Sequence, residues 1–414
     1  MRVSISKGKA KGFVPAPPSK SMAHRLLICA GISEGVSVIH GIAESKDVLA
    51  TIDCLEVMGA KCERSGDTIT VTGTDVRAAA PSGILQCRES GSTLRFFVPL
   101  CLLSGANAVL AGAESLMKRP LGIYKTICDE RGLIFSQDEN SVMLKGPLKQ
   151  GCFKLAGNIS SQFISGLLFA LPLLEGDSKV TITPPVESRS YINMTMSALE
   201  TFGVKACWHD ENTIIVKGGQ KYRPCEAWVE GDYSNTAFFE ALNVFGGEVE
   251  IGGLAPESIQ GDKVYAQMFE QLKIGTPTLN ISDCPDLGPI LFSVAAAQSG
   301  GVFSGTGRLK IKESDRGRVM ADVLSKFGVS ATVYEDEIVI YPAKFHGPEE
   351  PLYGYNDHRI VMSEAVLLTL TGGEIEGAEA VTKSFPDFFD KLRNLGIEVK
   401  EIKEIAADGG EING

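Results

Sequence analysis

Residues 51–73 read TIDCLEVMGAKCERSGDTITVTG, and this segment shows how the chain is organised. Its apolar residues first recur with a helical period. A Gly and two short β-rich runs joined by a polar turn follow. Gly59 falls where the helix has to end, and a residue without Cβ adopts the left-handed backbone of a helix cap most easily. The segment therefore predicts a helix followed by a β-hairpin.

The same pattern recurs along the chain. Close copies are TMSALETFGVKACWHDENTIIVKG at 195–218 and MADVLSKFGVSATVYEDEIVIYP at 320–342, weaker ones follow Tyr124 and Phe388, and a degraded one covers 268–282. The predicted helix caps are Gly59, Gly132, Gly203, Gly328 and Gly396. A spacing of about 50 to 75 residues predicts six units, arranged as two domains of three. An α/β protein with chance recurrences is the alternative, and it is disfavoured because helix length, Gly position and the following strand recur together.

Length and composition agree with two domains in a soluble enzyme. The chain has 414 residues, of which 44% are hydrophobic and 22% charged, and a single core seldom serves so long a chain. The opening residues lack a signal-peptide core and no apolar run is long enough to span a bilayer, so we expect a cytoplasmic protein without a membrane partner. The repeat phase resets near 227–235, where the domains are expected to meet.

Charge and cysteine usage point to a small-molecule partner. The formal net charge of -11 disfavours nonspecific binding to nucleic acid, although a basic pocket can exist in an acidic protein. The ten cysteines are scattered singly, without a C-x-x-C pair or a nearby His cluster. We therefore expect reduced, mostly buried thiols and no metal site.

A second, more apolar set of predicted helices starts with basic residues. Ser, Asp and Asn at these starts are ordinary N-caps, but Lys and Arg oppose the positive end of the helix dipole. The basic residues are Lys20, Arg25, Arg95, Arg119, Arg189, Arg316, Arg359 and Lys383. A single such residue would be expected to point into solvent. Eight in an acidic chain predict a shared anionic ligand, such as phosphate or carboxylate.

The motifs around these starts resemble the 5-enolpyruvylshikimate-3-phosphate synthase (EPSP synthase) family in chain order. They are PSKSxxxR at 18–25, SGSTxR at 90–95, KRPLG at 118–122, SSQF at 160–163, CPD at 284–286, KESDR at 312–316, NDHR at 356–359 and KSFPD at 383–387. One such motif alone is weak. Eight in the same order, spread over nearly the whole chain, make a chance match implausible.

The resemblance implies an α/β fold of two similar domains, each of three βαβαββ units, which face an interdomain cleft that closes on substrate. The N-terminal domain would comprise residues 17–229 and hold the shikimate 3-phosphate side of the cleft. The C-terminal domain would comprise residues 1–16 and 230–414. The chain would cross twice, near Pro17 and near Glu230, so that the first strand joins the C-terminal domain.

The resemblance also implies a transferase of the shikimate pathway, which leads to chorismate and the aromatic amino acids. Such an enzyme transfers the enolpyruvyl group of phosphoenolpyruvate to the 5-hydroxyl of shikimate 3-phosphate through a tetrahedral intermediate, and then releases phosphate. It needs no cofactor and no metal. The herbicide glyphosate occupies the phosphoenolpyruvate site in this family. We expect a monomer.

The same resemblance assigns the site residues. The catalytic residues would be Asp286, Glu313 and Lys20. Shikimate 3-phosphate would contact Lys20, Ser21, Arg25, Ser160, Ser161, Gln162, Ser188, Tyr191, Asp286 and Lys312. Phosphoenolpyruvate would contact Lys20, Gly91, Arg119, Gln162, Arg316, Arg359 and Lys383. Tyr191 would lie beneath the shikimate ring, and Gly91 would permit close approach to an anion because it has no Cβ. Singly, each of these residues also fits an ordinary structural role, for example as a helix cap.

Two residues depart from the family pattern. Glu89 stands where an Asn is common before the glycine turn, and Arg308 stands where some members have Asn before KESDR. Four histidines have no nearby residues in the sequence that would suggest a catalytic or metal-binding role, and we interpret them as structural or surface residues: His24, His40, His209 and His346. His358 is interpreted only as the motif residue next to Arg359.

Two other functions compete with this interpretation. A UDP-N-acetylglucosamine enolpyruvyl transferase has the same fold and donor, but that family carries a Cys on the loop before its Arg-Pro. This chain reads AGAESLMKRPLG at 111–122, without Cys. A noncatalytic anion-binding protein on the same scaffold would lack an acid or base, whereas Asp286 and Glu313 are both present.

Overall fold

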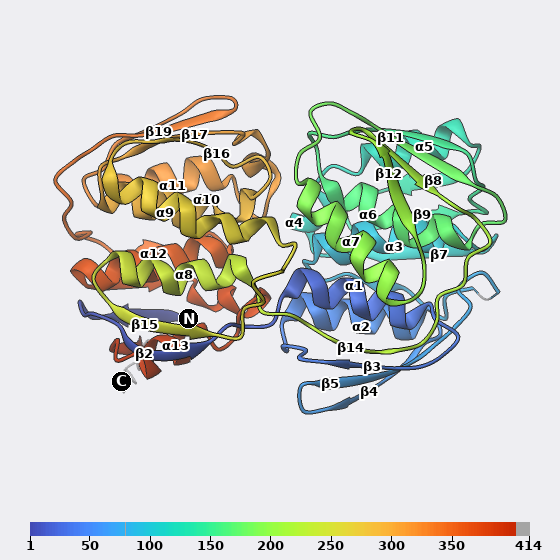
Figure 1. The fold of residues 1–414 in the computed structure, drawn as a ribbon, viewed down its shortest axis with the longest axis horizontal. Coiled ribbons are helices and arrows are strands. Elements are labelled where there is room, and N and C mark those ends of the chain that lie inside the picture. The colour runs from blue at the N-terminus through green and yellow to red at the C-terminus, as the bar shows by residue number, and fades with distance from the viewer. Residues whose placement is uncertain (79, 403–414) are drawn as a thin grey trace, which may run out of the picture.

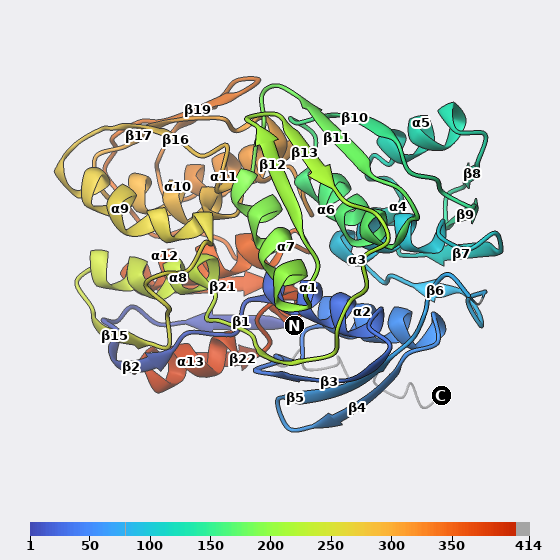
Figure 2. The same ribbon diagram turned by 45° about the vertical axis from the view of Figure 1, so that its right-hand side comes forward.

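The computed structural model describes residues 1–78 and 80–402. They form two halves that lie side by side, one coloured blue to green and one coloured mainly yellow-green to red, which also contains the blue residues 1–16 (Figure 1). In each half the helices gather toward the inside and the strands form sheets around them (Figures 1 and 2). The predicted fold class, an α/β protein of two similar halves, is confirmed.

Among the described residues, the N-terminal half contains three four-stranded sheets, ordered β14-β3-β5-β4, β6-β7-β9-β8 and β10-β11-β13-β12. The elements are α1 (Lys20–Gly31), β3 (Gly35–His40), α2 (Lys46–Val57), β4 (Lys61–Ser65), β5 (Thr68–Gly73), β6 (Leu85–Gln86), α3 (Gly91–Cys101), β7 (Asn107–Ala111), α4 (Glu114–Met117), α5 (Gly122–Glu130), β8 (Ile134–Gln137), β9 (Ser141–Lys145), β10 (Cys152–Ala156), α6 (Ser161–Ala170), β11 (Ser178–Thr183), α7 (Arg189–Thr201), β12 (Ala206–Asp210), β13 (Thr213–Val216) and β14 (Glu226–Trp228).

In the C-terminal half, as far as residue 402, there are two four-stranded sheets, ordered β16-β17-β19-β18 and β20-β21-β1-β22, and a two-stranded sheet β15-β2. The elements are β1 (Arg2–Ile5), β2 (Lys11–Pro15), α8 (Tyr233–Val244), β15 (Glu248–Gly252), α9 (Tyr265–Ile274), β16 (Thr278–Asn280), α10 (Gly288–Ala297), β17 (Gly301–Ser304), α11 (Arg316–Ser325), β18 (Ala331–Val333), β19 (Glu337–Ile340), β20 (Leu352–Tyr353), α12 (His358–Thr371), β21 (Gly373–Glu376), α13 (Phe388–Asn394) and β22 (Val399–Ile402).

The predicted repeat is present in these sheets. Each four-stranded sheet begins with a parallel pair and continues with two antiparallel pairings, as in β10, β11, β13 and β12. The five predicted cap glycines all have positive φ, between 65° and 104°. In the segment predicted to be a degraded copy, 268–282, helix α9 is followed by β16, an edge strand of the sheet β16-β17-β19-β18, and not by a hairpin.

The chain passes between the halves at two adjacent points. The Ser19 amide donates to the Glu230 carbonyl at 2.8 Å, and the Asp232 amide donates to the Pro17 carbonyl at 2.7 Å. On the N-terminal side of this crossing, β1 pairs with β21 and β22, and β2 pairs with β15. The first strand is therefore part of the C-terminal half, as the resemblance implied.

Each half has its own hydrophobic core. One cluster of buried residues runs from Met22 to Ala227, and the other combines residues 3–14 with residues 233–399. These cores support domain boundaries at 17–229 and at 1–16 with 230–414, which we propose for this chain. The last part of the second range, residues 403–414, lies outside the described residues.

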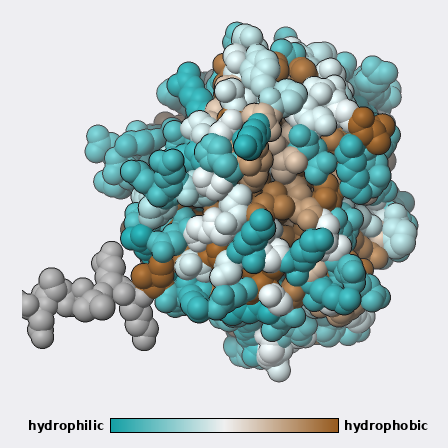
Figure 3. Space-filling view, turned by 90° about the vertical axis from the view of Figure 1, so that its left-hand side faces the viewer, coloured by the Kyte–Doolittle hydropathy of each residue, from teal (hydrophilic) through white to brown (hydrophobic). Residues whose placement is uncertain are grey.

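The surface of the C-terminal half is mainly hydrophilic, with scattered hydrophobic side chains and a hydrophobic strip near the middle of the face in Figure 3. None of the helices in residues 1–78 and 80–402 has the length and apolar character needed to cross a lipid bilayer. Six of the ten cysteines are buried, and all ten are free thiols.

Candidate active site

One cavity lies between the two halves, where the starts of several helices meet. Helices α1, α3, α6 and α7 contribute from the N-terminal half, and α11, α12 and the 3-10 helices Pro285–Leu287 and Gly307–Ile311 contribute from the C-terminal half. Eight basic and four acidic side chains line it. The cavity therefore has an excess of positive charge in a chain of net charge -11, which favours an anionic ligand.

All but one of the predicted site residues line this cavity. They are Lys20, Ser21, Arg25, Gly91, Arg119, Ser160, Ser161, Gln162, Ser188, Tyr191, Asp286, Lys312, Glu313, Arg316 and Arg359. Lys383 lies outside the lining, where it donates to the Asn356 carbonyl at 2.6 Å and forms an ion pair with Glu89. The assignment of each residue to one of two substrates stays a prediction.

The basic residues predicted to share an anionic ligand divide into two groups. Lys20, Arg25, Arg95, Arg119, Arg316 and Arg359 line the cavity. Lys383 and Arg189 do not. The Arg189 guanidinium carbon lies 3.8 Å from the centre of the Trp208 ring and the side chain donates to the Glu211 carbonyl at 2.7 Å. The prediction is therefore wrong for Arg189, because a nearby aromatic ring and a carbonyl satisfy its charge locally.

Polar N-caps fix where these helices begin. Ser19 Oγ accepts from the Met22 amide at the start of α1, and Ser160 Oγ accepts from the Gln162 amide at the start of α6. Asp357 accepts from the Arg359 amide at the start of α12. The remaining amides of the first turns and the helix dipoles add positive potential to the cavity.

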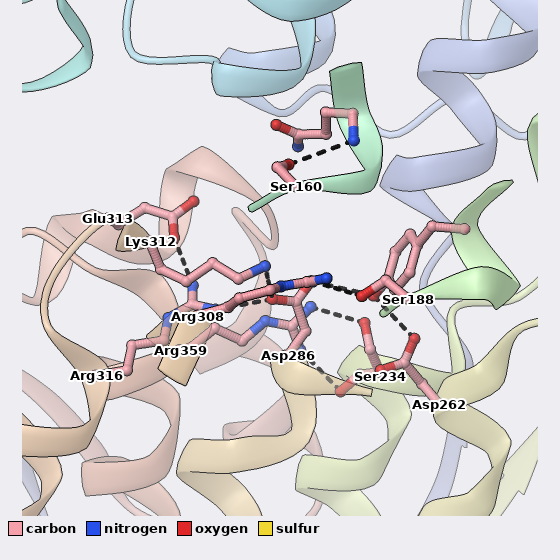
Figure 4. Close-up of polar contacts among 12 residues, drawn as sticks. Ser160, Ser188, Ser234, Asp262, Asp286, Arg308, Lys312, Glu313, Arg316 and Arg359 are labelled. Carbon is pink, nitrogen blue, oxygen red and sulfur yellow. Dashed lines mark hydrogen bonds and ion pairs between the residues drawn. The ribbon is translucent and has the colours of Figure 1, made fainter. Parts of the chain in front are cut away.

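Arg316 connects the two candidate proton-transfer groups (Figure 4). Its Nη1 donates to Asp286 at 2.8 Å, and its Nη2 donates to Glu313 at 2.7 Å. Its Nε and Nη2 also donate to Asp357 at 2.9 and 3.1 Å. The side chain is only 1% exposed. Arg316 therefore holds both Asp286 and Glu313 in fixed orientations at the wall of the cavity.

Nearby cations keep these carboxylates ionised. Burial by itself would raise the pKa of Asp286, but Lys312, Arg359 and Arg316 outweigh it and hold that pKa well below its usual range. Lys312 Nζ lies 3.1 Å from Asp286. Burial is likewise outweighed at Glu313, whose pKa is held well below its usual range by Arg316 and Arg119. Both groups are therefore ionised and can accept a proton.

The glycine turn lies directly against two guanidinium groups. A Cβ added to Gly91 would be 2.9 Å from Arg119 Nη1 and 3.1 Å from Arg95 Nη1. Arg95 donates to Gln162 Oε1 at 2.7 Å, and Gln162 in turn donates to Ser92 Oγ at 2.9 Å. The absence of a side chain at Gly91 therefore leaves the two cations accessible from the cavity.

Arg25 joins the starts of α1 and α7. It donates to Thr195 Oγ1 at 2.9 Å, to the Ser21 carbonyl at 2.6 Å and to the Tyr191 carbonyl at 3.0 Å. Its side chain is buried beneath the cavity. Arg25 therefore holds together Ser21 and Tyr191, which are predicted, like Arg25 itself, to bind shikimate 3-phosphate.

The two departures from the family pattern both make contacts between the halves. Arg308 donates to Ser188 Oγ and lies 3.4 Å from Glu187. Glu89 pairs with Lys383 and accepts from Asn356 at 3.1 Å. Arg308 and Glu89 thus hold the N-terminal half against the C-terminal half.

Several cavity residues were missed by the sequence interpretation. Asp47 lines the cavity and lies 2.9 Å from Lys20 Nζ. His358, to which no role was assigned, also lines it, and burial followed by the charge of Lys20 lowers the pKa of this His well below its usual range. His358 is therefore neutral. The sequence signal that could have identified His358 as a cavity residue is its position at the start of α12, directly before Arg359. His24 is buried against Thr51, whereas His209 and His346 are exposed.

No group of three or more His, Cys, Asp or Glu side chains within residues 1–78 and 80–402 is placed to hold a metal ion. The cavity instead combines cations, helix starts and two ionised carboxylates. The fold and this cavity define a class of enzymes that bind small anionic substrates between two similar halves built from βαβαββ units.

Comparisons with known proteins identify the family. The family model described as EPSP synthase (3-phosphoshikimate 1-carboxyvinyltransferase) matches residues 6–392. A 3-phosphoshikimate 1-carboxyvinyltransferase of Clostridium beijerinckii is 38% identical over 422 residues, which cover 95% of this chain and 97% of the relative. One from Clostridium perfringens is also 38% identical, over 95% of this chain and 98% of the relative. The chain belongs to the EPSP synthase family.

Solved structures agree with this assignment. An EPSP synthase from Acinetobacter baumannii superimposes with a TM-score of 0.77 at 26% identity, covering 97% of this chain and all of the other. The enolpyruvyl transferase NikO from Streptomyces tendae has a TM-score of 0.78 at 13% identity, which shows a shared fold.

Proposed function

We propose that this chain transfers the enolpyruvyl group of phosphoenolpyruvate to the 5-hydroxyl of shikimate 3-phosphate and releases phosphate. The observation that carries the proposal is the contact of Arg316 with both Asp286 and Glu313 in a cavity rich in cations. The reaction needs cations for a carboxylate and two phosphates, one group that accepts a proton and another that donates one. The cavity supports this proposal with its cations and with two ionised carboxylates, each of which can accept a proton.

The two substrates are proposed to occupy adjoining parts of the cavity. Shikimate 3-phosphate contacts Ser21, Arg25, Ser160, Ser161, Gln162, Ser188, Tyr191, Asp286 and Lys312. Phosphoenolpyruvate contacts Gly91, Arg119, Gln162, Arg316, Arg359 and Lys383. Lys20, at the start of α1, contacts both. For Lys383 this requires release from Glu89, with which it forms an ion pair.

Asp286 and Glu313 take different parts in the proposed reaction. Asp286 removes the proton of the 5-hydroxyl as its oxygen attacks C2 of phosphoenolpyruvate. Glu313 carries the proton that is added to C3 in the first step and removed in the second. Anionic substrates that pair with Arg316 and Arg119 reduce the effect of these cations on Glu313, so its affinity for a proton rises when the substrates bind.

The transfer to UDP-N-acetylglucosamine is the competing activity. No Cys lines the cavity within the described part of the chain, and the loop before Arg119 lacks one. A noncatalytic role is disfavoured by the two ionised carboxylates at the cavity wall. We also propose that the protein is a cytoplasmic monomer that binds neither nucleic acid nor membranes. Its negative net charge disfavours nonspecific binding to nucleic acid and to anionic membranes.

Mass spectrometry of the acceptor tests the proposal. The purified protein is incubated with phosphoenolpyruvate and either shikimate 3-phosphate or UDP-N-acetylglucosamine. The mass of an enolpyruvyl group should be added to shikimate 3-phosphate alone. Addition to the UDP-sugar, or to neither acceptor, would contradict the proposed function.

A further inference from the structure

A phenol lies between two carboxylates where the halves meet. The hydroxyl oxygen of Tyr191, in the first turn of α7, is 3.0 Å from Asp262 Oδ2 and 3.1 Å from Asp286 Oδ2. Asp262 belongs to the 3-10 helix Gly261–Val264, is 2% exposed and lies behind Tyr191, outside the cavity lining. Figure 4 shows Asp262 and Asp286 as separate carboxylates near Ser188. Neither the motifs nor the proposed reaction gives Asp262 a role.

The two contacts of this phenol need two hydrogens if both are to be hydrogen bonds, and the phenol itself supplies only one. A phenol has a single O–H donor, so it cannot donate to Asp262 and Asp286 at the same time. With one carboxyl protonated, each of the two contacts contains one hydrogen. Tyr191 keeps its own hydrogen, because burial and the charges of Asp262 and Asp286 raise the pKa of the phenol well above its usual range. The three groups can therefore exchange a proton along two hydrogen bonds.

The two carboxyls differ strongly in their affinity for that proton. Asp286 forms ion pairs with Arg316 at 2.8 Å and Lys312 at 3.1 Å. Asp262 Oδ1 is buried without a partner among the described residues, and burial followed by the charge of Asp286 raises the pKa of Asp262 to about 7. The cations around Asp286 hold its pKa well below the usual range. A proton that reaches Asp286 is therefore more stable on Asp262.

We propose that Tyr191 and Asp262 form a proton relay that takes the acceptor's hydroxyl proton from Asp286 and holds it on Asp262 during turnover. The inference rests on the proposed function in that it takes Asp286 as the base. The acceptor oxygen bonds to C2 of phosphoenolpyruvate and its proton passes to Asp286. That proton then passes to the Tyr191 oxygen while the phenolic hydrogen passes to Asp262 Oδ2. Asp286 is again a carboxylate and Tyr191 is again a phenol. After product release the proton returns along the same contacts to Asp286, which loses it to the solvent in the open cavity, so that the relay is restored.

The relay predicts a specific pH dependence. Asp262 accepts a proton only in its ionised form, so turnover should fall as the pH drops through about 7. The charged and titratable groups near Asp262 include Asp286 and Asp232, which raise its pKa, and Arg359 and Tyr191, which lower it. The thiol of Cys284 is also nearby, and the charge of Asp262 helps to raise the pKa of that thiol. In this relay Asp262 does not contact the substrates. It acts through Tyr191, from which it accepts the proton and on which it depends for returning it.

Two conservative substitutions interrupt the relay at different points. Tyr191→Phe keeps the ring and removes only the hydroxyl, and Asp262→Asn keeps the size of the side chain but cannot take up the proton. Each should lower kcat about 10- to 100-fold near pH 8, change the acceptor KM by less than about threefold, and abolish the decline of kcat near pH 7. Tyr222→Phe is the matched control, because that hydroxyl donates to the Phe169 carbonyl away from the cavity. It should behave as the wild type.

An infrared pH titration of the ligand-free protein provides a second readout that needs no substrate. The C=O band of a protonated carboxyl should titrate near pH 7 in the wild type and in Tyr222→Phe, and it should be missing in Asp262→Asn. If the wild type releases no phosphate from the two substrates, the proposed function fails, while the band still reports on Asp262. If the wild type is active and Tyr191→Phe keeps its kcat and its decline near pH 7, the relay is wrong. Survival in Asp262→Asn of a band that titrates near pH 7 also overturns it, whereas a protonated-carboxyl band that does not titrate there belongs to another group, such as Glu364.

Discussion

At the scale of single residues, Arg316 limits what each neighbouring group can do. A guanidinium has five N–H donors, and four hydrogen bonds to three carboxylates engage those of Arg316 in the described structure. At most one N–H is left for phosphoenolpyruvate. Arg316 therefore contributes orientation of Asp286 and Glu313 as well as charge, and loss of either carboxylate has a distinct consequence.

Replacing the two carboxylates should separate binding from proton transfer. Asp286→Ala should raise the KM for shikimate 3-phosphate and lower kcat, because it removes the proposed base and leaves Lys312 and Arg316 without a shared partner. Glu313→Gln keeps the shape of the side chain, so it should leave KM nearly unchanged and lower kcat by about 10² to 10⁴. Exchange of deuterium from solvent into C3 of phosphoenolpyruvate checks the assignment. Wild-type exchange in Glu313→Gln would move the proton carrier elsewhere, with Lys20 as the next candidate.

Gly91→Ala should weaken glyphosate more than phosphoenolpyruvate. The new methyl group would lie 2.9 Å from Arg119 Nη1, so it must displace that guanidinium or project into the anion site. Glyphosate is longer than phosphoenolpyruvate and fills more of the site, so the lost space should weaken its binding more. Inhibition constants and KM values for both proteins measure this difference. Equal weakening of inhibitor and substrate would contradict the steric explanation.

The helix-start motifs predicted most site residues, but not how these residues pair. Lys20 and Arg359 were found because basic residues at helix starts are unfavourable without an anion. Asp47 and Asp262 could not be found in this way, since an acidic residue near a helix start is ordinary. Their roles depend on long-range contacts with Lys20 and Tyr191, which no local pattern encodes.

At the scale of elements, local sequence signals predicted the helix-Gly-hairpin units. They could not predict which half of the molecule the first strand joins. Positive φ at Gly59 and Gly203 follows from the need to reverse the chain after a helix. By contrast, β14 completes the sheet of β3, and β1 lies between β21 and β22. Strand pairing over such distances depends on the packing of whole units, so only the family resemblance indicated that the first strand joins the far half.

Helix α12 contains a buried acid that should reduce stability. Both carboxylate oxygens of Glu364 are buried without a partner among the described residues, and burial raises the pKa of this carboxyl well above its usual range. The unfolded chain ionises it above about pH 4.3, so the folded state binds more protons there and stability falls as the pH rises. Glu364→Leu should remove this part of the decline and add about 1 to 3 kcal/mol at pH 8. Urea unfolding of both proteins at pH 5 and pH 8 measures it. An equal pH dependence in the two would contradict the argument.

At the scale of the whole molecule, the halves meet around a cavity with excess positive charge. Contacts across it include Arg308 with Ser188 and Glu89 with Lys383. Anionic substrates should bind cations of both halves and stabilise the closed arrangement, so small-angle scattering with both substrates should give a smaller radius of gyration than the free protein. The same should hold when glyphosate replaces phosphoenolpyruvate. An unchanged radius at saturation would contradict closure.

The most direct test of the proposed function is release of inorganic phosphate from phosphoenolpyruvate, measured with and without shikimate 3-phosphate. The wild type should release phosphate only when the acceptor is present, in an amount equal to the acceptor consumed. Lys20→Met, which removes one charge-assisted contact worth about 1.5 to 3 kcal/mol, should be folded but nearly inactive. Release that does not depend on shikimate 3-phosphate, or no release by the wild type, would contradict the assignment of this cavity to enolpyruvyl transfer.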